Sequence, residues 1–131
     1  MSDYVYDLMK KHHSVRQFKD KALSDETVQK LVEAGQSAST SSYLQTYSII
    51  GVDDPEIKKQ LKEVSGQPYV VDNGYLFVFV LDYYRHNLIN ENVDFDMQTS
   101  FESAEGLLVG AIDVALVSEN VALAAEDMGY G

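Results

Sequence analysis

Cysteine and tryptophan are absent from the sequence, and proline occurs only twice in 131 residues. The absence of cysteine excludes disulfide bonds, thiolate metal ligands and a cysteine nucleophile, and it is compatible with a reducing compartment. The first residues also lack the basic and apolar segments of a secretory signal. We therefore expect a cytoplasmic protein.

Positive charge is also scarce, because 10 Lys and Arg residues stand against 21 Asp and Glu residues and give a net charge of −11. Such a surface repels nucleic acids and anionic membranes, so we expect neither as a partner. Half of the basic residues fall in one short stretch, namely Lys10, Lys11, Arg16, Lys19 and Lys21. A local positive patch on an acidic chain predicts a small anionic ligand.

Long apolar runs are few. The run 75–81 is too short to cross a bilayer, and the run 107–117 contains Asp113, so we expect no membrane span. With 45% hydrophobic residues the chain can bury a core, and its length predicts one domain over residues 1–131.

The first half of the chain predicts two helices and a strand. Apolar residues at helical spacing predict a short helix over 3–12, and Ser24 is a predicted N-cap for a second helix over about 25–38. The basic segment 13–23 has no clear period and is predicted to be a loop. The β-branched and aromatic run 47–52 predicts a strand.

The second half predicts a helix, a strand and a polar excursion. Asp54 followed by Pro55 is typical of a helix start, and Gly66 is predicted to end that helix. The continuous apolar run 75–81 predicts a strand buried on both faces. Residues 83–98 are polar and poorly periodic, which predicts a surface excursion with about one helical turn.

A long helix is predicted over 100–128, with Gly129 just after its end and a length of about 40 Å. It is apolar on more than one side and needs more cover than the rest of the chain provides, which indicates a partner chain or further sequence. His86 is predicted to lie on the surface. The acidic residues of this helix could form paired carboxylates, but exposure on the helix or salt links between subunits explain them at least as well; these residues are Glu102, Glu105, Asp113, Glu119, Glu126 and Asp127.

The first group of candidate site residues is His12, His13, Ser14 and Arg16. All four side chains can donate hydrogen bonds, and the Arg16 guanidinium can bind a phosphate through two parallel bonds. A solvated basic loop is the alternative. A metal site is not expected, because the side chains of adjacent histidines diverge and no HExxH spacing occurs.

Two further groups are polar segments. Thr40 lies in a run of small hydroxyl residues at 39–42, whose amides and hydroxyls could hold ligand oxygens, although an ordinary loop after a helix is the alternative. Gln67 precedes Pro68 and Tyr69, and its amide could pair with the edge of a flavin or base. An ordinary turn is the alternative for this segment.

Taken together, these segments resemble the nitroreductase and NADPH-dependent flavin reductase family, in its oxygen-insensitive branch. The matching residues run in order along the chain: His12, Ser14, Arg16 and Phe18; the segments 38–45, 48–51, 66–70 and 77–79; and Asp113, Ala115, Asn120, Ala124, Ala125, Glu126, Gly129 and Gly131.

The resemblance implies an α+β fold with a long central helix and helices around a small, mainly antiparallel sheet. It implies a homodimer with one FMN per subunit at the dimer interface. NADPH or NADH would give a hydride to flavin N5, and nitroaromatics, quinones or flavins would then take the electrons in a ping-pong reaction. No side chain need be catalytic in this scheme.

The resemblance also implies the cofactor-binding residues. His12, His13, Ser14 and Arg16 would face the phosphate and ribityl chain of FMN. Thr40 would lie near the flavin, and Gln67 and Tyr69 would approach the edge of its ring. At His13 the family usually has arginine, and because a neutral imidazole holds phosphate less well, we expect a weaker anion site.

Family members are about twice as long as this chain. The resemblance therefore identifies residues 1–131 as the N-terminal part of one nitroreductase-like domain, truncated after the central helix. From this we expect an incomplete copy or partial sequence that binds FMN weakly or not at all by itself. The alternative is a non-catalytic remnant that serves as a helical oligomerisation module.

Overall fold

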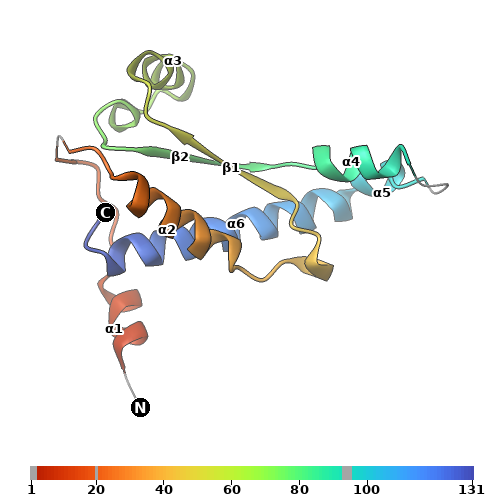
Figure 1. Ribbon diagram of the computed structural model, residues 1–131, viewed down its shortest axis with the longest axis horizontal. Helices are drawn as coiled ribbons and strands as arrows, with labels where there is room; N and C mark the ends of the chain where they lie inside the picture. Colours follow the sequence, from red (N-terminus) through yellow and green to blue (C-terminus); the bar gives the residue numbers. More distant parts are fainter. Residues whose placement is uncertain (1–2, 20, 93–95) are drawn as a thin grey trace.

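The computed structural model describes residues 3–19, 21–92 and 96–131. In this part of the chain a two-stranded antiparallel sheet lies against two packed helices (Figure 1). The helices are α1 (Tyr4–Lys11), α2 (Asp25–Gln36), α3 (Pro55–Ser65), α4 (Tyr84–Asn90), α5 (Gln98–Phe101) and α6 (Ala104–Asp127). Two short 3₁₀ turns, η1 (Ser41–Tyr43) and η2 (Pro68–Val70), and two strands, β1 (Tyr47–Val52) and β2 (Leu76–Leu81), complete the elements. The predicted α+β class with a small antiparallel sheet and a long helix is confirmed.

The predicted caps explain where two of the helices begin and end. The Ser24 side chain accepts a hydrogen bond from the N–H of Thr27 at the start of α2. The Asp54 side chain caps α3 in the same way, with Pro55 in the first turn. Gly66 ends α3 with a φ of 67°, a left-handed conformation that glycine adopts without a steric cost.

The core lies between α2, α6 and the inner face of the sheet. Leu31 of α2 and Val117 of α6 are almost fully buried. Gly35 allows the two helices to approach closely, because a Cβ at this position would lie 2.8 Å from a methyl carbon of Val121 and 3.1 Å from the Cδ1 of Ile49. This packing places α6 beneath both α2 and the sheet (Figure 1).

The prediction that the strand near 75–81 is buried on both faces is wrong. Only one face of the sheet packs against the helices, and its residues include Ile49 and its partner Phe79. The other face carries Ile50, which is 48% exposed, and Val80, which is 36% exposed. A continuous apolar run such as 75–81 is typical of a strand buried on both faces. Among the described residues, however, the helices cover one face of this sheet.

Two further predictions need correction. The long helix is divided, because α5 ends at Phe101 and the Ser103 side chain caps a separate helix by accepting from the N–H of Gly106. The excursion predicted over 83–98 contains all of α4 rather than a single turn. Part of that predicted segment, residues 93–95, lies outside the described residues.

One side of α6 remains uncovered by the described residues. Its exposed apolar side chains are Leu107 and Leu108 (each 63% exposed), Ile112 (57%) and Leu116 (44%), and we call them the α6 stripe. By length and composition α6 could also cross a membrane, since its most apolar 18-residue window has a mean hydropathy of 1.8 and only 22% of that window is buried. The α6 stripe is therefore exposed, and its cover by a partner chain or further sequence stays a prediction.

Candidate cofactor site

The loop between α1 and α2 connects two places that are distant in the sequence. At its start the Nδ1 of His12 lies 2.7 Å from the Oε1 of Glu126, at the end of α6. Farther along, a Cβ on Gly74 would lie 2.1 Å from the backbone oxygen of Lys21, so this part of the loop touches the turn before β2. Arg16 lies between these two anchor points.

An open depression of about 500 Å³ forms where this loop meets the turn after α3. Its lining residues are Arg16, Gln17, Phe18, Gln67, Pro68, Tyr69 and Asp72. The fold thus brings together Arg16, Gln67 and Tyr69, three of the candidate residues predicted from sequence. Asp72 was not predicted, and its carboxylate opposes anion binding on this side of the depression.

Arg16 is the main source of positive charge in this depression. Its side chain is exposed and has no hydrogen bond or ion pair with any other residue that the structure describes. In a chain with a net charge of −11, an arginine without a carboxylate partner is available to bind an anion. The guanidinium can offer parallel N–H groups to a phosphate or carboxylate.

The turn that carries Gln67 and Tyr69 is held by two residues that the sequence analysis did not identify. The Asn73 side-chain amide donates to the backbone oxygens of Tyr69, at 3.0 Å, and Val70, at 2.7 Å. Lys58 is only 5% exposed, and its ammonium donates to the backbone oxygen of Asn73 at 3.0 Å. A lysine at a helical position gives no indication in the sequence that it will be buried.

The other members of the first candidate group lie just before Arg16. His12 bonds Glu126, and the Nδ1 of His13 lies 2.9 Å from the backbone oxygen of Lys11. Ser14 is exposed. One ring nitrogen of each histidine is therefore occupied within the chain, and Nε2 is the nitrogen left to meet a ligand.

Thr40 is not part of this depression. The next residue, Ser41, donates its N–H to Asp113 at 2.9 Å, and Asp113 lies 13 residues before Glu126 on α6. At 1.5 Å per residue, the Thr40 loop and the His12 end of the site are separated by about 20 Å along the helix axis. A single copy of this chain therefore brings Arg16, Gln67 and Tyr69 together but leaves Thr40 apart.

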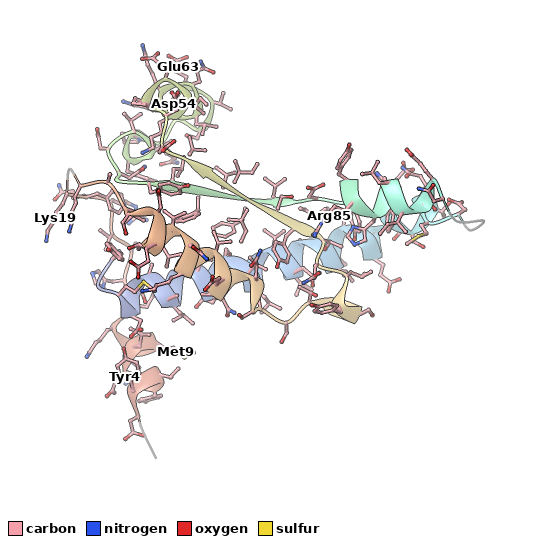
Figure 2. All side chains as sticks on the ribbon, in the orientation of Figure 1. Tyr4, Met9, Lys19, Asp54, Glu63 and Arg85 are labelled. Atoms are coloured by element: carbon pink, nitrogen blue, oxygen red, sulfur yellow. The ribbon has the colours of Figure 1, made fainter. Side chains whose placement is uncertain are left out.

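The Thr40 loop, defined as residues 40–46, is held rigidly by side chains from elsewhere. Three of its residues have left-handed backbone conformations with φ between 52° and 56°, namely Ser42, Tyr43 and Gln45. Arg85 donates to the backbone oxygen of Gln45 at 2.7 Å, and Figure 2 shows this side chain near the start of β1. Strained loop conformations persist only where the surroundings fix them.

Two residues that hold this loop were assigned wrongly from sequence. Asp113 was predicted to be exposed or in a salt link, but it is fully buried and also accepts from the Thr46 hydroxyl at 3.1 Å. His86 was predicted to lie on the surface, but it is only 8% exposed and its Nε2 lies 2.7 Å from the backbone oxygen of Leu44. In both cases the partner is more than 40 residues away in the chain, so local sequence could not reveal it. The position of Asp113 as the one charged residue within the apolar run 107–117 was the available signal for its burial.

Asp82 forms a polar junction beside this loop. It accepts hydrogen bonds from the Ser48 hydroxyl and the N–H of Tyr84, and these lower the pKa of its carboxyl below the usual value. The positive charge of the nearby Arg85 also lowers the pKa of Asp82. The ionised Asp82 therefore fixes the start of α4, the helix that supplies both Arg85 and His86.

A metal centre finds no support in the described ranges 3–19, 21–92 and 96–131. Within them, no group of three or more histidine, aspartate or glutamate side chains is placed to hold a metal ion. The features that remain are the basic depression, the fixed Thr40 loop and the α6 stripe.

Comparison with known proteins gives one consistent match. The nitroreductase family profile matches residues 9–131. An NADPH-dependent oxidoreductase of Staphylococcus epidermidis is 77% identical over the whole chain, which covers 52% of that protein, and one of Staphylococcus aureus is 71% identical with the same coverage. The chain therefore spans about half the length of the curated relatives that it matches.

Solved structures of similar proteins agree with this match. NfrA1 from B. megaterium has a TM-score of 0.93 and 50% sequence identity, with 96% of this chain and 51% of that chain covered. The NADPH:FMN oxidoreductase from Vibrio harveyi, solved with NAD+, has a TM-score of 0.84 and 37% identity, with 95% and 52% covered.

Proposed function

The chain belongs to the nitroreductase family, and from this premise we propose that it supplies the phosphate and ring-edge side of an FMN site in an NAD(P)H-dependent oxidoreductase. The observation that carries the proposal is the depression in which Arg16, Gln67 and Tyr69 converge from distant parts of the sequence. The relatives named as NADPH-dependent oxidoreductases, and the solved NADPH:FMN oxidoreductase, support the same reaction class.

The residues of the depression fit a flavin nucleotide by their chemistry. Arg16 has no partner among the described residues and can bind the phosphate. Gln67 carries both a donor and an acceptor, which suits the edge of an isoalloxazine ring, and Tyr69 offers an apolar face with a polar tip. Hydrogen bonds donated by the side chains of Lys58 and Asn73 hold the turn that carries Gln67 and Tyr69 in place.

When bound, FMN would supply the redox chemistry that connects NAD(P)H with a nitroaromatic, quinone or flavin acceptor. The role proposed for the chain's own residues is to bind FMN and to orient it. Arg16 would hold the anionic end of FMN, and the amide of Gln67 would hydrogen-bond the edge of its ring. In this proposal no side chain of the chain acts as a nucleophile or general acid.

We also propose that the site is completed between two copies. The Thr40 loop is fixed to α6 at Asp113, directly next to Ile112 of the exposed α6 stripe. A second copy seated on this stripe would meet the Thr40 loop, and the loop would then reach the second copy's depression rather than its own. This arrangement would account for the separation of about 20 Å, along the α6 axis, between the Thr40 loop and the His12 end of the site in one chain.

A second copy suits the α6 stripe better than lipid does. The helix carries five acidic residues, and these are Glu105, Asp113, Glu119, Glu126 and Asp127. Charged residues within a bilayer are costly, whereas an apolar stripe flanked by acids is typical of a protein interface. We propose a cytoplasmic homodimer, in keeping with the absence of cysteine.

The test is the flavin content of the purified protein and its NADPH oxidation. We expect weak FMN binding, because the chain spans about half the length of its relatives, and we expect Arg16→Ala to weaken it by a further factor of about 30, because a charge-assisted phosphate contact is lost. Lys62→Ala removes an equal charge outside the Arg16 depression and should change binding by less than about twofold. Equal effects of the two substitutions would contradict the assignment of Arg16.

The α6 stripe also favours a second candidate, a non-catalytic oligomerisation module. The flavin content of the purified protein distinguishes the two candidate functions. A well-folded dimer that takes up no FMN and oxidises no NAD(P)H would support the module and overturn the enzyme proposal.

A further inference from the structure

Asp72 and Arg16 line the same depression, yet they do not pair with each other. Arg16 belongs to the loop after α1, whereas Asp72 lies in the turn between η2 and β2. Within the part of the chain that the structure describes, neither side chain forms a hydrogen bond or an ion pair. The depression therefore presents an unpaired cation and an unpaired carboxylate to the same ligand.

Hydrogen bonds fix the backbone on both sides of Asp72. The side-chain amide of Asn73 donates to the backbone oxygens of Tyr69, at 3.0 Å, and Val70, at 2.7 Å, which closes the turn around Asp72. The ammonium of Lys58 donates to the backbone oxygen of Asn73 at 3.0 Å. The Asp72 side chain itself is exposed. A fixed backbone thus carries its carboxylate at the depression, where it can accept a hydrogen bond from a ligand.

The two unpaired charges restrict the kind of ligand that suits the depression. The Arg16 guanidinium favours an anionic group, and the Asp72 carboxylate repels a second one. An ionised carboxylate accepts hydrogen bonds and cannot donate them. A fitting ligand therefore has one anionic end and, apart from it, an N–H or O–H donor. FMN meets both requirements, because it has one phosphate and the edge of its ring has an N–H, at N3, between two carbonyl oxygens.

We propose that Asp72 is a specificity-determining residue of this site and that its carboxylate accepts a hydrogen bond from the N3–H of the flavin ring. The inference rests on the proposed FMN site. Asp72 follows Gln67 and Tyr69 in the same turn, and these two residues are assigned to the ring edge, so its partner is the ring rather than a ribityl hydroxyl. The side-chain amide of Gln67 then donates to a carbonyl oxygen beside N3.

The proposal predicts an effect opposite in sign to simple charge repulsion. Asp72→Leu removes a negative charge from a site that binds an anion, which by Coulomb's law alone should strengthen FMN binding. If the carboxylate accepts from N3–H, the same substitution should weaken FMN binding about fivefold, because a hydrogen bond to a charged group is lost. Leucine keeps the branching of aspartate, with two methyl groups in place of the two carboxylate oxygens.

FMN and N3-methyl-FMN are the two probes, and fluorescence titration gives their dissociation constants. Both carry the same phosphate, so the ratio of the two constants isolates the contact at N3. In the original chain we expect N3-methyl-FMN to bind about tenfold more weakly than FMN, and in Asp72→Leu only about twofold more weakly. Asp72→Asn keeps a neutral acceptor oxygen and should give an intermediate ratio of about threefold.

Glu63→Leu is the matched control. Glu63 lines a neighbouring depression, which meets that of Arg16 at Pro68. The substitution makes the same change of charge outside the proposed site, and the ratio should stay within about twofold of that in the original chain.

The possible outcomes separate this inference from the proposed function. A ratio in Asp72→Leu equal to that in the original chain, or tighter FMN binding by this variant, would overturn the role of Asp72, while a loss of FMN binding in Arg16→Ala would still support the site. Failure of the original chain to bind FMN would overturn the proposed function together with this inference. If circular dichroism shows that Asp72→Leu does not fold, Asp72→Asn decides, and an unchanged ratio in that variant would overturn the role of Asp72.

Discussion

The Thr40 loop and the Arg16 depression, which lie toward opposite ends of α6, differ in how their polar groups are hydrogen-bonded. At the Thr40 loop, Asp113, Arg85 and His86 all bond groups that are distant in the sequence, and the loop is held in a strained conformation. At the Arg16 end the depression is open, and the guanidinium has no partner among the described residues. Figure 2 shows Arg85 near the start of β1, and Lys19, which is exposed, at the opposite side of the molecule.

The difference indicates two separate roles. A loop whose hydrogen bonds are made internally is a rigid surface that can be presented to another molecule. A depression whose charged group lacks an internal partner is where a ligand can bind. The predictions below test whether these two ends are distinct in this way, beginning with the largest expected effect.

Asp113→Ala should have the largest effect on stability. It leaves the Ser41 N–H and the Thr46 hydroxyl without their shared acceptor in a buried site, and we expect a loss of about 3 kcal/mol in the free energy of unfolding. Urea denaturation measures this loss. Asp113→Asn keeps one acceptor oxygen and should lose about half as much, whereas an effect below about 1 kcal/mol would show that the loop is not anchored at this residue.

Leu108→Glu should weaken the association of two copies. Leu108 is 63% exposed in one chain, and its burial in a dimer would contribute about 2 kcal/mol per copy. Sedimentation velocity should therefore show at least about a 30-fold weaker dimer. Val64→Glu is the control, since Val64 is 89% exposed on α3, away from the α6 stripe. Identical behaviour of the two variants would place the interface elsewhere.

Ser48→Ala should have a smaller effect that depends on pH. The Ser48 hydroxyl helps to lower the pKa of Asp82 in the folded state, so its contribution is present above the unfolded pKa of about 3.9 and is lost as pH falls through the lower folded pKa. We expect a loss of about 1 kcal/mol at pH 7 that vanishes in strong acid.

The control for this prediction is Ser118→Ala. The Ser118 hydroxyl donates to Ala115 within the same helix, and its removal should cost less than about 0.5 kcal/mol at any pH. A Ser48→Ala loss that does not change with pH would mean that the bond to Asp82 contributes nothing to the stability at neutral pH.

Local signals in the sequence predicted most of the elements. β1 was predicted with its observed bounds because its β-branched and aromatic residues are framed by polar ones, and α3 was predicted from Asp54, Pro55 and Gly66. α4 was predicted only as about one helical turn, because most of its seven residues are polar and seven are too few for a period to show. The break before α6 depends on one capping contact of Ser103, and helix propensity alone does not reveal it.

The candidate site was only partly accessible from sequence. The resemblance placed Arg16, Gln67 and Tyr69 in one site, and the fold brings them together. The residues that hold the site were not found, because Lys58 and Asp113 become buried only through contacts with distant segments. The separation of Thr40 from Arg16 depends on tertiary packing, and no pattern in the sequence predicts it.

The most direct test of the central claim uses mixed dimers of Arg16→Ala and Thr40→Glu, purified through two different tags. Each variant alone should bind FMN weakly. If Arg16 of one copy and Thr40 of the other serve the same site, each mixed dimer has one site with both native residues and should regain one FMN site with the affinity of the original chain. Mixed dimers that bind FMN as weakly as either parent would show that both residues act within a single chain, and they would contradict this account.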